Sequence, residues 1–254
     1  MRRKYIKYLN IWMFALILSI PIYFNAQKNE APINILFVGN SFTYFWNMPH
    51  LVEAMSKTQG VPVQIQQSTV GGTNLMQHWK SEKGTVTRQL INDMKWDYVI
   101  FGDHSLSTIE APKRFKKYSS KFAELVRSKG AEPIFFITWA YKSNPLMQNC
   151  ITKGYMDLTK ELNVRVFPVG PVFMKAKTLQ PDLELYFDDK HPSSDGTYLI
   201  ALTITKFLLD KSVKTVPNRL TTLDKDGKNL YLSFVRPTTG TFFRQLVEEL
   251  DENF

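Results

Sequence analysis

The chain alternates short apolar segments with longer ones in which apolar residues recur every three or four positions. Apolar runs at residues 33–38, 98–101, 133–138 and 164–169, and an alternating run at 61–67, predict β-strands. Helical spacing predicts helices between and after these strands, at residues 48–59, 85–94, 112–128, 147–162 and 193–209, with a weaker one at 242–249. Repetition of strand and helix predicts an α/β protein with a central parallel sheet covered by helices on both faces.

The first residues have the pattern of an export signal. Four cations, Arg2, Arg3, Lys4 and Lys7, precede an apolar stretch at residues 9–24. We expect a signal peptide over residues 1–26, cleaved after Ala26, and therefore a periplasmic or secreted protein without stable membrane contact. The alternative is an uncleaved N-terminal anchor, which would hold the protein at the membrane. Residues 33–254 form one predicted domain.

Composition narrows the function classes. The 254 residues are 44% hydrophobic and 22% charged, with a formal net charge of +9, and this balance is typical of a globular protein. Basic residues are not interleaved with aromatic ones, and no helix-turn-helix or finger spacing occurs, so we expect no nucleic-acid partner. Paired histidines or Cys/His pairs at ligand spacing are also lacking, and we expect no metal and no cofactor. Cys150 is the single cysteine, and we expect it to be a small buried residue within a helix.

The residues directly after each strand are candidates for a functional site, because ligand sites in parallel sheets lie beyond the carboxyl ends of the strands. Gly39-Asn40-Ser41 follows the first strand and Gly71-Gly72 follows the second. A serine in such a turn, at the start of a helix, is placed as a nucleophile whose own amide helps to bind an oxyanion. A simple polar turn that starts a helix explains the same residues.

Two histidines extend this pattern. His104 follows the third strand, where it could be a base, an oxyanion donor or a surface turn residue. Late in the chain, Asp188 precedes His191 by three residues, and a turn of that length brings its carboxylate to imidazole Nδ1, leaving Nε2 free for a serine. Asp189 is the adjacent competitor for that role, and a charged loop that caps a helix is the alternative reading.

Together these segments resemble the SGNH hydrolases, also called GDSL-like esterases. Gly39-Asn40-Ser41 is similar to the first family motif, and Asp188-x-x-His191 followed by Pro-Ser is similar to the last. The resemblance covers about residues 33–209. It implies a three-layer α/β/α sandwich of flavodoxin-like type, Ser41 as nucleophile, and Asp188 and His191 as the other members of a triad.

The resemblance also implies an oxyanion hole formed by Ser41, Gly72 and the third motif. That motif usually reads Gly-x-Asn, whereas this chain has Gly102-Asp103-His104. A neutral histidine also donates one N–H, but its reach differs from that of asparagine. In a 2-1-3-4-5 strand order, the exit loops of the first three strands bring Ser41, Gly72 and His104 to one edge of the sheet.

The sequence therefore predicts an exported serine esterase. Its substrate would be a small-molecule or glycan ester, and a short acyl group such as acetyl on a carbohydrate is favoured by the resemblance. Tyr44, Trp46 and Trp139 are candidate stacking platforms for a sugar, although we expect at least one of them to pack in the core. Two alternatives remain open: an O-acyltransferase that uses a sugar acceptor, and a degenerate, non-catalytic carbohydrate-binding domain.

Overall fold

A five-stranded parallel sheet forms the centre of the protein. The computed structural model describes residues 31–250, so the predicted signal peptide lies outside the described residues. The strands lie in the order β2-β1-β3-β4-β5, and every neighbouring pair is parallel. They are β1 Ile33–Gly39, β2 Val63–Thr69, β3 Tyr98–Phe101, β4 Glu132–Phe136 and β5 Arg165–Phe167. This order confirms the predicted 2-1-3-4-5 fold.

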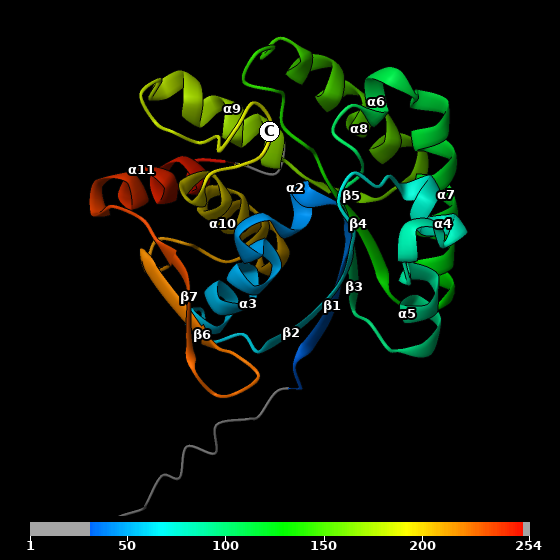
Figure 1. Cartoon of the computed structure of the whole chain (residues 1–254), viewed down its shortest axis with the longest axis horizontal. Helices are drawn as coiled ribbons and strands as arrows, with labels where there is room; N and C mark the ends of the chain where they lie inside the picture. The colour runs from blue at the N-terminus through cyan, green and yellow to red at the C-terminus, as the bar shows by residue number, and fades with distance from the viewer. Residues whose placement is uncertain (1–30, 251–254) are drawn as a thin grey trace, which may run out of the picture. The chain divides into compact units, whose positions relative to one another are not determined.

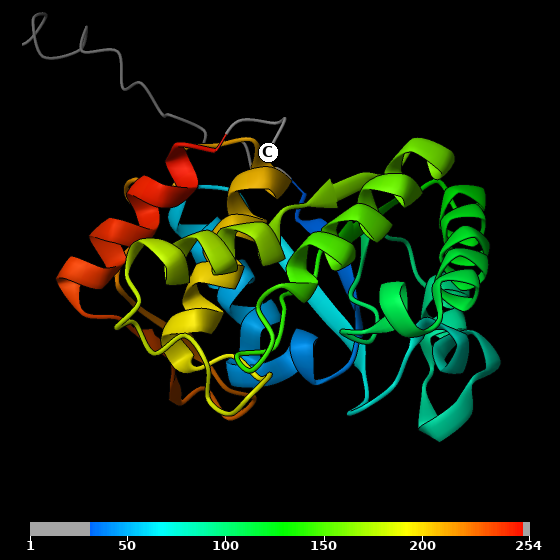
Figure 2. The same ribbon diagram turned by 90° about the horizontal axis from the view of Figure 1, so that it is seen from above.

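Helices cover both faces of the sheet (Figures 1 and 2). On one face lie α3 Met48–Thr58, α9 Val169–Leu179, α10 Ser194–Leu209 and α11 Pro237–Glu248. On the other lie α4 Leu75–Lys80, α5 Thr87–Asp93, α7 Pro112–Ser128 and α8 Met147–Leu162. Short helical turns lie between these elements: α2 Ser41–Tyr44, η1 Phe45–Asn47, η2 Glu82–Gly84 and α6 Ser107–Glu110. The three layers are those of an α/β/α sandwich.

The alternation of side chains along each strand divides the core into two clusters. In β1, Ile35 and Phe37 pack with the α3 and α10 side, whereas Leu36 and Val38 pack with the α7 and α8 side. All four side chains are fully buried. Burial of each contributes roughly 1.5–3 kcal/mol of hydrophobic stabilisation, and this explains why the strand is apolar at these four consecutive positions.

The structure differs from the sequence-based expectation in several elements. Helices α7 and α8 have the predicted bounds, but α9 was not predicted, and α11 begins at Pro237, five residues before the predicted start at 242. An antiparallel hairpin of β6 Arg219–Leu223 and β7 Asn229–Phe234 was missed entirely.

The prediction for Cys150 was wrong, because its side chain is exposed. The buried face of α8 is made by Gln148, Ile151, Tyr155 and Leu158, at helical spacing, and Cys150 lies outside that face. Among residues 31–250, none of the helices has the length and apolar character needed to cross a membrane.

Candidate active site

A cleft of about 330 Å³ lies where strands β1, β2 and β3 end. The segments that follow these strands supply Ser41, Gly72 and His104 to its walls, and His191 reaches it from the loop before α10. Tyr44, Phe45, Ser105, Tyr141 and Lys190 also line it. The cleft therefore brings together four of the five residues singled out from the sequence, and the fifth, Asp188, lies behind His191.

Backbone contacts fix the turn that carries Ser41. A Cβ atom on Gly39 would lie 2.7 Å from the carbonyl oxygen of Gly102, so only glycine lets β1 and β3 end this close together. Asn40 caps the following helix by accepting a hydrogen bond from the Phe42 amide at 3.0 Å, and it donates to the carbonyl of Thr73 at 2.9 Å. The buried Asn40 side chain thus ties the Ser41 turn to the loop after β2.

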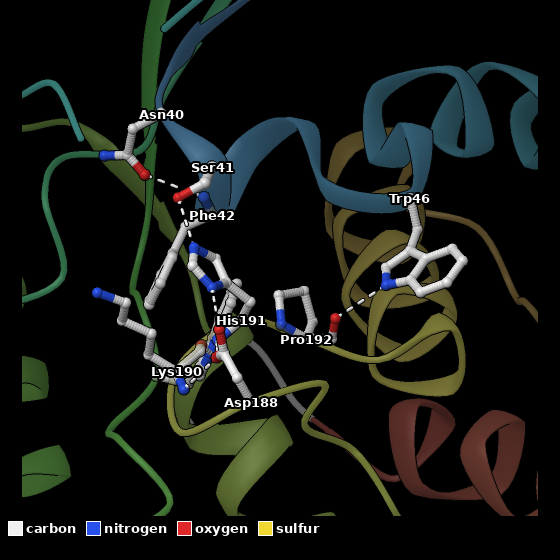
Figure 3. Close-up of polar contacts among 9 residues, drawn as sticks. Asn40, Ser41, Phe42, Trp46, Asp188, Lys190, His191 and Pro192 are labelled. Carbon is white, nitrogen blue, oxygen red and sulfur yellow. Dashed lines mark hydrogen bonds and ion pairs between the residues drawn. The ribbon is translucent and has the colours of Figure 1, made fainter. Parts of the chain in front are cut away.

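Ser41, His191 and Asp188 form a continuous hydrogen-bonded series (Figure 3). The Nε2 atom of His191 lies 2.9 Å from Ser41 Oγ, and its Nδ1 atom lies 2.7 Å from Asp188 Oδ2. Asp188 Oδ1 accepts from the amides of Lys190 and His191, at 2.8 and 2.7 Å. These contacts close the loop into a tight turn around the carboxylate.

The charge of Asp188 sets the tautomer of His191. Partial desolvation opposes ionisation of Asp188, but hydrogen bonds from the His191 side chain and from the His191 and Lys190 amides prevail and lower its pKa to about 2. An ionised carboxylate can only accept, so Nδ1 of a neutral His191 must carry the ring proton. The Nε2 lone pair then faces the Ser41 hydroxyl, the geometry needed for proton removal.

Asp189, the sequence-based competitor, has a different set of partners. Its carboxylate accepts from the amide and the hydroxyl of Ser143, at 2.8 and 2.9 Å, and its carbonyl accepts from Lys142. Asp189 therefore anchors its loop to the segment after β4, and the contact with His191 belongs to Asp188.

Aromatic side chains hold the His191 ring in place. Phe45 stacks on the imidazole with ring centroids 4.3 Å apart, and Phe42 meets it edge-on at 5.9 Å. Trp139 stacks on Phe42 at 4.4 Å and donates from Nε1 to the Lys190 carbonyl at 2.8 Å. Because Trp139 is fully buried, it belongs to the core support of the site and offers no face to a sugar.

The three groups predicted to form an oxyanion hole line the same cleft. Within residues 31–250, the backbone amides of Ser41 and Gly72 donate no hydrogen bond, which leaves both N–H groups available to a ligand. His104 accepts from the Leu106 amide at Nδ1, at 3.4 Å. Its Nε2 atom must then carry the ring proton when the ring is neutral, so His104 is a hydrogen-bond donor of the kind an oxyanion requires.

Two buried polar residues behind the cleft were not predicted. Asp103 accepts at Oδ1 from the amides of Leu75 and His104, at 2.9 and 2.7 Å, and burial raises its pKa despite these bonds. It ties the start of α4 to His104. Its position directly after a buried strand was the available signal, because a carboxylate there must find partners.

His78 is the second of these residues. Its Nε2 atom lies 3.0 Å from the Gly39 carbonyl and 2.9 Å from Thr73 Oγ1, and its Nδ1 atom lies 2.6 Å from Thr87 Oγ1. Desolvation lowers its pKa to about 4, although the bond to the Gly39 carbonyl opposes this shift. The neutral ring supports the turn before Ser41 from beneath. Nothing in the local sequence distinguishes it from an ordinary helix residue.

The chain is similar in fold to several solved structures, among them one assigned as an SGNH hydrolase. A protein from Slackia heliotrinireducens assigned as an SGNH hydrolase matches 70% of this chain and all of its own length, with 21% identity and a TM-score of 0.61. A DUF4886 family protein from Bacteroides uniformis matches 85% of this chain and 93% of its own, with 18% identity and a TM-score of 0.69. An acetyl xylan esterase, AlAXEase, matches 69% of this chain and all of its own, with 13% identity and a TM-score of 0.56.

No protein-family model and no curated protein matches the sequence. At these identities, the solved structures establish that the chain has the SGNH hydrolase fold. Among residues 31–250, His, Cys, Asp and Glu side chains form no group that could hold a metal ion.

Proposed function

We propose that this chain, which has the SGNH hydrolase fold, is a serine esterase with Ser41 as nucleophile, His191 as general base and Asp188 as the carboxylate that orients His191. The observation that carries the proposal is the hydrogen-bonded series Asp188–His191–Ser41, which opens onto a cleft with free N–H donors. A domain that only binds its ligand has no need of a base aligned on a serine hydroxyl.

The reaction proceeds through an acyl-enzyme. Ser41 Oγ bonds to the ester carbonyl carbon as its proton passes to His191 Nε2. The amides of Ser41 and Gly72 and the ring of His104 stabilise the resulting oxyanion. The bond to the alcohol then breaks, and His191 returns the proton to the departing oxygen. Water then attacks the acyl carbon as His191 takes its proton. The bond to Ser41 Oγ breaks, His191 returns the proton to that oxygen, and the acid is released.

For the substrate we propose a short acyl ester, such as acetyl, on a carbohydrate. The cleft is small, and its walls carry hydroxyl and amine groups from Tyr44, Ser105, Tyr141 and Lys190. These groups suit a polyhydroxylated alcohol better than a long acyl chain. One similar structure is an acetyl xylan esterase. We propose export to the periplasm or outside the cell on the pattern of residues 1–26.

Hydrolysis of p-nitrophenyl acetate by the wild-type protein and by Ser41→Ala tests the proposal. We expect the substitution to lower kcat by about 10⁴-fold or more, because the triad acts as a unit. Equal rates in the two proteins would contradict the proposal. A folded wild type that binds glycans without turnover would favour the non-catalytic alternative. Acyl transfer to an added sugar in place of water would favour the acyltransferase.

A further inference from the structure

A second hollow, the hairpin groove, lies next to the catalytic cleft. It has a volume of about 380 Å³ and is lined by Trp46 and Ser194 together with hairpin residues Arg219, Tyr231, Ser233 and Phe234. None of these residues lines the catalytic cleft. The groove is therefore a separate feature, built by the hairpin that follows the parallel sheet.

The groove presents large aromatic side chains to solvent. The exposed fractions are 46% for Trp46, 64% for Tyr231 and 70% for Phe234. Exposed apolar side chains that cluster in this way often mark a binding surface. The Arg219 guanidinium lies over the Tyr231 ring, 4.9 Å from its centroid, so a cation also borders the groove.

An apolar strip connects the groove to the catalytic histidine. Phe45 stacks on His191, and Phe187, which is 65% exposed, lies 6.1 Å from the Phe45 ring and 6.3 Å from the Trp46 ring. Figure 3 shows Trp46 on the far side of Pro192 from Ser41. A ligand in the catalytic cleft can therefore continue over Phe187 toward Trp46 and the hairpin.

The backbone holds Trp46 at this position despite a conformational cost. Trp46 and Asn47 both have positive φ, 50° and 55°, which non-glycine residues rarely adopt in succession. Strain of this kind persists where the surroundings enforce it, as binding sites often do. Here the Trp46 indole donates to the Pro192 carbonyl at 3.0 Å.

We propose that the hairpin groove is a subsite for sugar residues next to the esterified one, so that the substrate is an oligosaccharide or polysaccharide. The inference rests on the proposed esterase function. A pyranose ring has C–H faces that suit the rings of Trp46, Tyr231 and Phe234, and hydroxyl edges that suit Arg219 and Ser194. An acyl chain would leave those polar groups without partners.

The test compares kcat/KM on p-nitrophenyl acetate, on acetylated monosaccharides and on acetylated hexasaccharides, with xylose and xylohexaose as one pair and glucose and cellohexaose as the other. We expect at least one hexasaccharide to be preferred over its monosaccharide by about tenfold or more, as one or two stacked rings would give. Tyr231→Ala and Phe234→Ala should each lower that preference severalfold, mainly through KM. Their rates on p-nitrophenyl acetate and on the monosaccharide should not change.

Leu223→Ala is the matched control, because Leu223 is 63% exposed on the same hairpin but does not line the groove. Equal rates on hexasaccharide and monosaccharide in both pairs would overturn the subsite. Equal effects of Tyr231→Ala and Leu223→Ala, or losses of the same size on all substrates, would also overturn it. Failure of the esterase proposal is a distinguishable outcome: the wild type would then not turn over p-nitrophenyl acetate. In that case, the affinities of the wild type and of the same variants for the unacetylated hexasaccharides test the subsite independently of catalysis.

Discussion

Trp46 donates its indole N–H to the Pro192 carbonyl over 3.0 Å, and this bond joins the segment that begins at Ser41 to the loop that carries His191. The two segments are far apart in the sequence and have no regular secondary structure in common. Stacking of Phe45 on His191 supports the same junction. The distance between nucleophile and base thus depends on side chains that take no part in the chemistry.

Trp46→Phe tests this dependence, because it keeps an aromatic ring and removes the N–H. We expect kcat on p-nitrophenyl acetate to fall about tenfold with a smaller change in KM, since small displacements of a catalytic group reduce the rate of the chemical step. Trp96→Phe is the control: Trp96 also donates its indole N–H to a backbone carbonyl, that of Leu90, away from the cleft. Equal kcat values in the two variants would contradict the role of the Trp46 bond.

The two neighbouring aspartates should differ sharply in their effect on catalysis. Asp188→Asn replaces an obligatory acceptor by an amide that can donate to Nδ1, which favours the wrong tautomer of His191. We expect kcat to fall by about 10³–10⁴-fold, as for other triads. Asp189→Asn should lower kcat by less than about tenfold, because Asp189 contacts Ser143 and not His191. A larger loss in Asp189→Asn than in Asp188→Asn would reverse the assignment.

Local patterns predicted most of the sheet and the long helices, because these segments have one burial pattern along their whole length. The hairpin was missed although Asp224 to Lys228 holds a turn signal, with Gly227 at φ +75° and Asp224 capping two amides. Helix α9 was missed because Gly170 and Pro171 suggest a loop. Pro171 lies in the first turn, where a proline is tolerated, and a Cβ atom on Gly170 would meet the Thr138 carbonyl at 2.1 Å.

The residues of the candidate site also differ in whether the sequence alone could identify them. Ser41, Asp188 and His191 could be selected from the sequence because each follows from local spacing and from the family resemblance. His78 could not, and for Asp103 only its position after a buried strand was a signal, since the roles of both arise from contacts with backbone groups of other segments, such as the Gly39 carbonyl and the Leu75 amide. Sequence spacing carries no information on such distant partners.

His104 takes the place of an asparagine in the motif that the chain resembles, so its contribution can be measured by exchange. We expect His104→Ala to lower kcat on p-nitrophenyl acetate by about 10²-fold, the usual effect of losing one oxyanion donor. His104→Asn should recover part of that loss, because an amide also donates. His50→Ala, in an exposed part of α3, is the control. Unchanged kcat in His104→Ala would remove this residue from the oxyanion hole.

His78 should make the stability of the fold depend on pH. Its pKa is lowered from 6.5 to about 4 in the folded protein, so between these values the unfolded chain binds a proton that the folded chain does not. Stability is therefore lost as the pH falls through this window. Between about pH 7 and pH 5, the free energy of unfolding should decrease by about 2 kcal/mol through this residue.

Urea denaturation of the wild type and of His78→Gln at the two pH values measures this contribution. Asp103, whose pKa burial raises, acts in the opposite direction, because the folded state then binds more protons than the unfolded one. The informative quantity is thus the difference between the two proteins. We expect the loss of stability on acidification to be smaller in His78→Gln than in the wild type. Identical acid sensitivity in wild type and His78→Gln would show that the buried imidazole is already protonated, or exposed, in the folded state.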